Sequence, residues 1–333
     1  MRYLTSLLIV LSIFLSGCKD EIDLPNTPRG NFEALWQILD EHYCFFKYKQ
    51  IDWDEVHDRY SARIKDNISD ESLFKILGEM LAELKDGHTN LYSSFDIARY
   101  WSWFEDYAPN FYPHLQDKYM KDDYQIAGGI RYRILPDNIG YMYYPSFSYN
   151  VGESNLDQIM YKLSVCDGII IDIRNNGGGD LTNVDVIASR FTNERVLVGF
   201  IVHKTGRGHD DFSDPYPRYI NPSSRHRYQK KVVLLTNRSS YSAANDFTNV
   251  MRQLPQVTVI GDKTGGGGGL PFSSELPNGW SVRFSASPMF DPNMNQMEFG
   301  IDPDEWVSIT KEDLDREVDT ILERAIEILK NNR

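Results

Sequence analysis

From Ile139 onward, short apolar segments alternate with helical patterns, and no other feature constrains the fold of this 333-residue chain so strongly. Two helices are predicted between the apolar segments, at 182–191 and 242–251. Strands are predicted at 139–144, 168–173, 196–202, 232–236, 257–261 and 280–287. Because several of these strands are continuously apolar, the pattern indicates a largely parallel, buried sheet. The sequence thus predicts an α/β domain over residues 136–333, which ends in one amphipathic helix with Thr310 as its N-cap.

Residues 31–95 show the period of helices instead. Apolar side chains recur there at three- and four-residue steps, first from Phe32 to Tyr43 and again from Leu73 to Leu84. Residues 96–135 are rich in aromatic side chains but have no clear period. We interpret them as a connection or a lid between an N-terminal helical region and the α/β domain.

The first 17 residues have the features of a signal peptide. Arg2 precedes an apolar run, Leu7–Leu15, that is too short to span a bilayer. The run leads into Leu15-Ser16-Gly17-Cys18, which looks like a bacterial lipobox, so Cys18 is the expected lipidation site and residues 18–30 the lipidated tether. We therefore expect an outer-membrane lipoprotein of the bacterial cell envelope, facing the periplasm or the outside. An ordinary secretory signal with a chance cysteine is the alternative.

Charge and cysteine content exclude other classes. The formal net charge of −13 argues against nucleic-acid binding, which needs a basic surface. The two remaining cysteines, Cys44 and Cys166, lie in apolar contexts and are expected to be buried free thiols. The sequence suggests no metal site and no cofactor.

Two strand-to-helix turns could carry chemistry. The segment 168–179 (GIIIDIRNNGGG) exposes backbone N–H groups near a helix start, which suits a phosphate or an oxyanion. It lacks the spacing of a nucleotide-binding loop. In 232–247, Ser242 begins a helix. Such a serine is usually an N-cap, yet several hydrolases present a nucleophilic serine at the same kind of turn.

A nucleophilic serine needs a base and an orienting group. His88 in LKDGHT and Glu298 in EFGIDPD are the candidates, each at the edge of a turn. Taken alone, each is more often an ordinary polar residue than a catalytic one.

These segments together, in this order, resemble the superfamily of tail-specific processing proteases, the tricorn protease core and the interphotoreceptor retinoid-binding protein modules. The matching pieces are LKDGHT (84–89), IGYMYYPSF (139–147), GIIIDIRNNGGG (168–179), VVLLTNRSSYSAANDF (232–247), IGDKTGGG (260–267), LPNGW (276–280) and EFGIDPD (298–304). The resemblance implies a ClpP/crotonase-like core of ββα units preceded by an N-terminal helical region. By position, Ser242 would be the nucleophile, and Gly178 and Ala243 would supply the oxyanion-binding N–H groups.

The departures from the family pattern favour its tricorn-like branch. Gly267 stands where the processing proteases have a lysine base, and Lys263 is the only substitute nearby. A PDZ domain has no room between the matching segments. In the tricorn-like branch a histidine is the base, so His88 would take the proton of Ser242 and Glu298 would orient His88.

Two further positions differ from that branch as well. Gly87 replaces a serine that tricorn carries before the histidine, and Asn245 replaces a glutamate often found after the nucleophile. The leading hypothesis is a lipid-anchored serine endopeptidase that cleaves peptides or unfolded protein segments. The alternative is a non-catalytic binding protein for a hydrophobic ligand or a peptide. Convergence of Ser242, His88 and Glu298 to about 2.6–3.2 Å would favour the enzyme.

Overall fold

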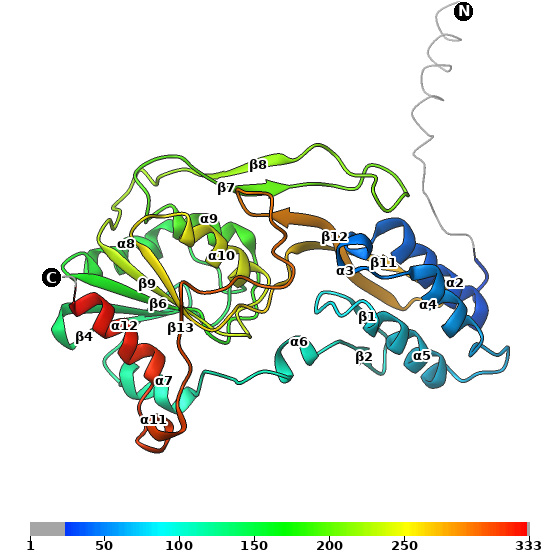
Figure 1. Ribbon diagram of the computed structural model, residues 1–333, viewed down its shortest axis with the longest axis horizontal. Helices are drawn as coiled ribbons and strands as arrows, with labels where there is room; N and C mark the ends of the chain where they lie inside the picture. Colours follow the sequence, from blue (N-terminus) through cyan, green and yellow to red (C-terminus); the bar gives the residue numbers. More distant parts are fainter. Residues whose placement is uncertain (1–23, 332–333) are drawn as a thin grey trace, which may run out of the picture.

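The computed structural model describes residues 24–331. The proposed signal peptide and Cys18 lie outside the described residues. The described chain forms two lobes, an α/β lobe and a helical lobe, with long strands running between them (Figure 1). Within residues 24–331, no helix combines the length and apolar character needed to cross a bilayer.

The α/β lobe is built on a seven-stranded sheet in the order β13-β10-β9-β6-β5-β4-β3. The five strands from β13 to β5 are parallel, whereas β3, β4 and β5 pair antiparallel. Their bounds are β3 (Gln125–Ala127), β4 (Ile130–Leu135), β5 (Ile139–Tyr143), β6 (Gly168–Asp172), β9 (Lys231–Thr236), β10 (Val257–Gly261) and β13 (Glu305–Trp306). Buried residues such as Ile169 and Ile171 pack to one side of β6 and Ile170 to the other, as the continuous apolar pattern predicts.

Helices cover both faces of this sheet. One face packs against α8 (Glu153–Leu163), α9 (Leu181–Ala188) and α10 (Ala243–Arg252). The other packs against α7 (Pro113–Met120) and α12 (Thr320–Lys330). The mixed α/β architecture with a preceding helical region is therefore confirmed.

The helical lobe packs on a second, strongly twisted sheet. Its helices are α2 (Pro28–His42), α3 (Phe46–Lys49), α4 (Trp53–Ser61) and α5 (Asp70–Ala82). The sheet contains β1 (Asn90–Tyr92), β2 (Ile97–Ala98), β7 (Val196–Ile201), β8 (Tyr216–Ile220), β11 (Gly269–Glu275) and β12 (Ser281–Phe290). Val282 and Phe284 of β12 lie in the core of the helical lobe. Because side chains alternate along a strand, Arg283 and Ser285 lie on its opposite face.

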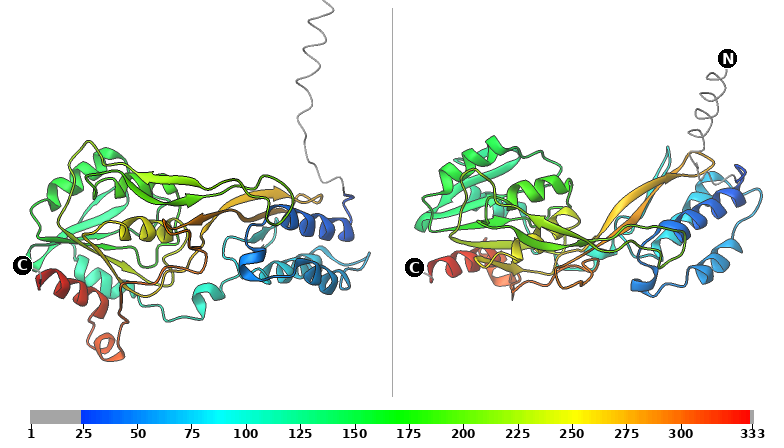
Figure 2. Two further views of the ribbon diagram at one scale, coloured as in Figure 1. Left: turned by 45° about the horizontal axis from the view of Figure 1, so that its top comes forward. Right: turned by 90° about the horizontal axis from the view of Figure 1, so that it is seen from above.

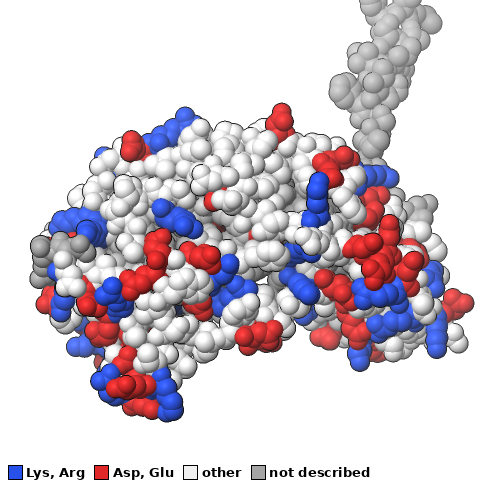
Figure 3. Space-filling view, in the orientation of Figure 1, with Lys and Arg blue, Asp and Glu red and all other residues white. Residues whose placement is uncertain are grey.

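The hairpin of β7 and β8 spans both lobes (Figure 2). Its loop contacts the helical lobe, where Lys47 binds Asp210 at 3.0 Å and His209 binds Asp40 at 2.7 Å. Segment 203–230, which is polar and contains several glycines and prolines, thus includes the paired strand β8. On the face in Figure 3, charged side chains of both signs are intermixed over the described residues.

The hairpin of β3 and β4 and the C-terminal helices are among the elements that differ from the sequence prediction. Strands β3 and β4 lie inside the predicted connection 96–135, joined by a turn in which Gly128 and Gly129 have φ of 57° and 77°. Positive φ at both positions is typical of a tight hairpin. The prediction of a single C-terminal helix is wrong. The first helix, α11 (Lys311–Asp315), ends after five residues, and α12 begins at a separate N-cap, Asp319. Cys44 and Cys166 are buried free thiols, as predicted.

Candidate active site

Ser242 lies on a strained turn between β9 and α10. Its φ of 57° and ψ of −118° are rare for any residue other than glycine, and such conformations concentrate at functional sites. A backbone hydrogen bond stabilises the turn, since the Ser242 N–H donates to the Gly266 carbonyl at 2.9 Å. Ser242 occupies the N-cap position of α10, but its side chain makes no capping hydrogen bond to the helix. Its hydroxyl is therefore available for other contacts.

His88 contacts that hydroxyl. Its Nε2 lies 2.9 Å from Ser242 Oγ, although the two residues are 154 positions apart and belong to different lobes. His88 is 4% exposed, and its backbone N–H donates to Asp86 Oδ1 at 2.8 Å. The structure thus brings together the two residues that the sequence suggested as nucleophile and base.

The environment of His88 favours the neutral imidazole. Burial lowers the pKa of His88 to about 4, although the nearby Asp86 carboxylate has the opposite effect and raises this pKa. Arg283 and Lys49 lower that pKa further. At neutral pH the ring can therefore accept a proton. Nδ1 is buried and has no hydrogen-bond partner within residues 24–331.

Glu298 lies in the same region but contacts other groups. Its Oε1 accepts from Lys49 Nζ at 2.7 Å, and its Oε2 accepts from the Gly268 N–H at 3.0 Å. Among the described residues, no hydrogen bond joins Glu298 to His88. Burial raises the pKa of Glu298 to about 7, and Asp86 adds to the increase, whereas Lys49 opposes it.

Lys49 is the residue that sequence reasoning missed. Its side chain is only 4% exposed, and its ammonium lies 4.0 Å from Asp86 Oδ2 as well as beside Glu298. A lysine in the short segment FKYK carries no motif, so only the tertiary contacts reveal it. Asp86 stands inside the motif LKDGHT, and its position next to His88 was the available signal.

The backbone donors near Ser242 differ from the expected pair. The Gly178 N–H already donates to Asn176 Oδ1 at 2.9 Å. Gly178 instead packs against the nucleophile turn, where a Cβ would lie 2.8 Å from the Ala243 nitrogen. Gly179 and Ala243 line a cavity with Ser242, and neither N–H donates a hydrogen bond within residues 24–331.

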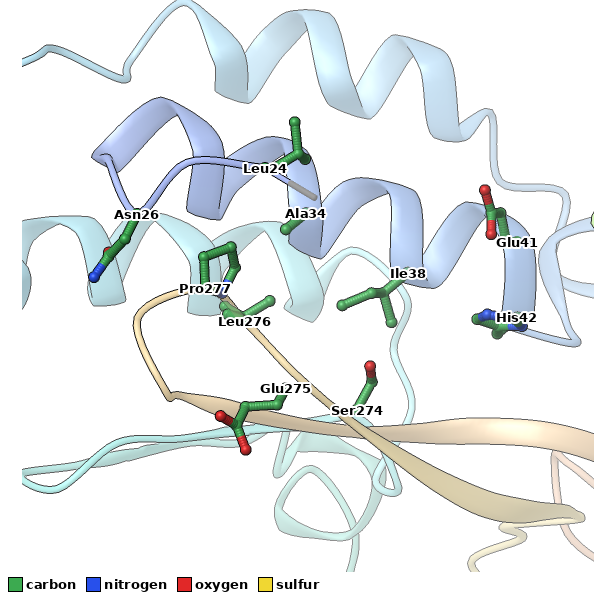
Figure 4. Close-up of a pocket in the computed structure, with 10 residues that line it drawn as sticks. All are labelled: Leu24, Asn26, Ala34, Ile38, Glu41, His42, Ser274, Glu275, Leu276 and Pro277. Atoms are coloured by element: carbon green, nitrogen blue, oxygen red, sulfur yellow. The ribbon is translucent and has the colours of Figure 1, made fainter. Parts of the chain in front are cut away.

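That cavity is small, about 60 Å³. Its walls combine apolar side chains with three polar ones: Leu181, Leu270, Pro271, Met289 and Met297 with Asn245, Asp246 and Arg283. A larger hollow of about 650 Å³ lies between α2 and the β11–β12 turn, lined by residues such as Ile38 and Leu276 (Figure 4). None of the predicted site residues lines it.

Tyr241 explains two of the departures from the family pattern. It stacks on Trp103 at 4.1 Å between ring centroids and meets the edge of His88 at 5.0 Å. A Cβ on Gly87 would lie 2.6 Å from Trp103 Nε1, and one on Gly267 would lie 2.6 Å from the Tyr241 ring. Neither a serine at 87 nor a lysine at 267 fits without displacing this aromatic pair.

Asn245, the third departing residue, and Lys263, the candidate substitute base, both have other partners. Asn245 is buried, accepts from Thr264 Oγ1 at 2.6 Å and donates to the Met297 carbonyl at 3.2 Å, so it ties α10 to the segment that carries Glu298. Lys263 pairs with Asp302 at 3.1 Å on the surface. Among the described residues, no group of three or more His, Cys, Asp or Glu is arranged to hold a metal ion.

Comparisons with known proteins match both lobes. The model of peptidase family S41 matches residues 138–307, and that of the tricorn protease C1 domain matches residues 24–82. A protein of Staphylococcus haemolyticus (strain JCSC1435), provisionally named a CtpA-like serine protease, is 29% identical over 170 residues, which are 50% of this chain and 33% of the relative. The chain spans a third or less of the length of the first curated relatives.

Solved structures give the same result. A crystal structure from Parabacteroides merdae ATCC 43184, provisionally described as a peptidase, is 59% identical with a TM-score of 0.88, and the match covers 92% of this chain and 97% of that one. Mature CPAF is 13% identical with a TM-score of 0.69, covering 91% of this chain and 96% of that one. At that identity the likeness to CPAF concerns the fold alone.

Proposed function

Since the chain belongs to peptidase family S41, we propose that it is a serine endopeptidase of tricorn-like type that cleaves peptides or unfolded protein segments. The observation that carries the proposal is the 2.9 Å contact between Ser242 Oγ and His88 Nε2 on a strained turn. The buried, neutral state of His88 supports its role as a base.

The reaction would proceed through an acyl-enzyme. His88 Nε2 takes the hydroxyl proton as Ser242 Oγ bonds to the carbonyl carbon of the substrate, and the imidazolium then gives that proton to the leaving amine. A water molecule then gives a proton to His88 Nε2 and attacks the acyl carbon. The ester bond to Ser242 breaks, and His88 returns the proton to Ser242 Oγ. We propose the N–H groups of Gly179 and Ala243 as donors to the oxyanion, because that of Gly178 is occupied. The small cavity beside Ser242 would hold a small side chain of the substrate.

A fluorophosphonate probe tests this proposal. It should label the wild type, whereas His88→Ala should label about 10²–10⁴-fold more slowly because Ser242 loses its base. Lys263→Ala should label at the wild-type rate, since Lys263 pairs with Asp302 on the surface. Labelling rates measured on gels, with peptide hydrolysis measured in parallel, show which of the two residues is the base. If only Lys263→Ala is impaired, the base is misassigned; if the wild type is inert, the binding-protein alternative is favoured.

We also propose that Cys18 anchors the protein to a membrane through acyl chains, on the basis of the lipobox-like sequence. Metabolic labelling with a palmitate analogue should mark the wild type and not Cys18→Ser. Equal labelling of both proteins would refute the anchor.

A further inference from the structure

We propose that Asp86, and not Glu298, is the carboxylate that supports His88 during proton transfer, and that Lys49 is the positioning residue that holds both carboxylates. The inference rests on the proposed function, because it concerns how the base works. It changes the role predicted for Glu298 from a direct partner of His88 to an indirect one.

The position of Asp86 is the first argument. Asp86 is 1% exposed and lies two residues before His88, whose backbone N–H it accepts at Oδ1. Its second oxygen, Oδ2, is buried without a hydrogen-bond partner within residues 24–331, as is His88 Nδ1. Around these two atoms lie the Lys49 ammonium, 4.0 Å from Asp86 Oδ2, the Ser285 and Tyr43 hydroxyls beside the Asp86 carboxylate, and the Gly269 backbone beside the His88 ring. The Asp86 carboxylate and the His88 ring are thus buried in the same short turn, beside the reacting pair.

The contacts of Glu298 are the second argument. Both of its carboxylate oxygens already accept a hydrogen bond, one from Lys49 Nζ and one from the Gly268 N–H. Forming a hydrogen bond to His88 would require Glu298 to give up one of these buried contacts, which costs free energy. Glu298 therefore acts on the base through Lys49.

Lys49 joins the two lobes at this point. Besides Glu298 at 2.7 Å, its ammonium donates to the carbonyls of Leu84 at 3.1 Å and Lys85 at 3.2 Å. Leu84 and Lys85 begin the loop that carries Asp86 and His88. One ammonium therefore fixes the loop of the base to the Glu298 segment, which itself packs on the nucleophile turn through Gly266 and Gly268.

Charge supports the same assignment. Burial opposes protonation of His88, and Asp86 is the strongest influence in the other direction. Burial alone would raise the pKa of Asp86, but Lys49 and His88 lower it overall, so Asp86 is ionised at neutral pH. The other titratable or charged groups around the cluster are Tyr43, Cys44, Tyr48, Tyr241 and Arg283. Without Asp86, the imidazolium would form near two cations, Lys49 and Arg283.

Asp86→Asn and Glu298→Gln form a matched pair for the test. Each variant removes one carboxylate and leaves Lys49 paired with the other, so neither leaves an uncompensated buried charge. Asparagine also keeps an acceptor for the His88 N–H. Lys47→Met, on the helix that carries Lys49 but exposed and paired with Asp210, controls for nonspecific effects. Circular dichroism checks that each variant folds.

Asp86→Asn should lower kcat by about 10²–10³-fold with KM changed less than about twofold, because the charge acts only once His88 is protonated. Glu298→Gln should lower kcat by about tenfold or less. In the Ser242→Ala background, NMR titration should show that Asp86→Asn keeps the His88 ring neutral at every pH at which the protein remains folded. The ring of the Glu298→Gln variant should titrate like that of its parent.

The inference is wrong if Glu298→Gln loses at least as much kcat as Asp86→Asn and His88 titrates unchanged in Asp86→Asn. Because the NMR titration needs no activity, it decides the role of Asp86 even if no peptide is hydrolysed, an outcome that would contradict the proposed function instead. If Asp86→Asn does not fold, Glu298→Gln remains decisive, since a shifted His88 titration there would place Glu298 beside the base.

Discussion

Ser242→Ala should reduce peptide hydrolysis by about 10⁴-fold or more and abolish fluorophosphonate labelling, because the covalent step has no other nucleophile. The variant should still fold, since the hydroxyl contacts His88 but caps no helix. Hydrolysis rates and labelling on the same preparation measure both effects. Labelling of the alanine variant at the wild-type level would refute Ser242 as the nucleophile.

Ser242→Gly is the matched control for the strain of the turn. Both variants lack the hydroxyl, but only glycine adopts a φ of 57° with a ψ of −118° at little cost. We expect the glycine variant to be more stable than the alanine variant by about 1 kcal/mol, even though glycine raises the entropy of the unfolded chain and thereby favours unfolding. Denaturant unfolding of the two inactive proteins gives this difference directly. An alanine variant of equal or higher stability would show that the turn stores no strain.

The sequence predicted the pairing of Ser242 with His88 through the resemblance of seven ordered segments to one protease superfamily, and neither residue would have been assigned its role from its local motif alone. The strand-helix alternation likewise predicted the parallel sheet, since a strand buried on both faces must be apolar throughout. The break between α11 and α12 escaped notice, because the apolar series continues through Val318 and hides the cap at Asp319.

The contacts around the base could not be predicted in the same way. Lys49 carries no motif, and its burial depends on two carboxylates that are distant in sequence, Asp86 and Glu298. The role of Gly178 was misjudged for a related reason. Whether a backbone N–H can bind an oxyanion depends on the acceptors around it, and the Gly178 N–H already donates to the Asn176 side chain. Sequence motifs thus identify the reacting atoms better than the groups that hold them.

Arg174 shows that the same glycine-rich motif also carries stability. It lies just after β6, fully buried, and its guanidinium donates to Asp172 Oδ1 at 2.9 Å and Oδ2 at 2.7 Å. It also donates to Asp319 Oδ1 at 3.0 Å. Because Asp319 caps α12, Arg174 ties the C-terminal helix to the end of β6, the central strand of the sheet.

Arg174→Met should therefore destabilise the fold by about 3–5 kcal/mol, because removing one partner leaves two buried carboxylates without a counter-ion. In thermal unfolding, this corresponds to a decrease in Tm of about 10 °C for a chain of this size. Arg316→Met is the control: Arg316 pairs with Asp313 at the surface, so its loss should leave the Tm close to that of the wild type. If Arg174→Met unfolds within about 2 °C of the wild type, the buried ion pairs contribute little. Packing of the apolar face of α12 on the sheet would then be what holds this helix in place.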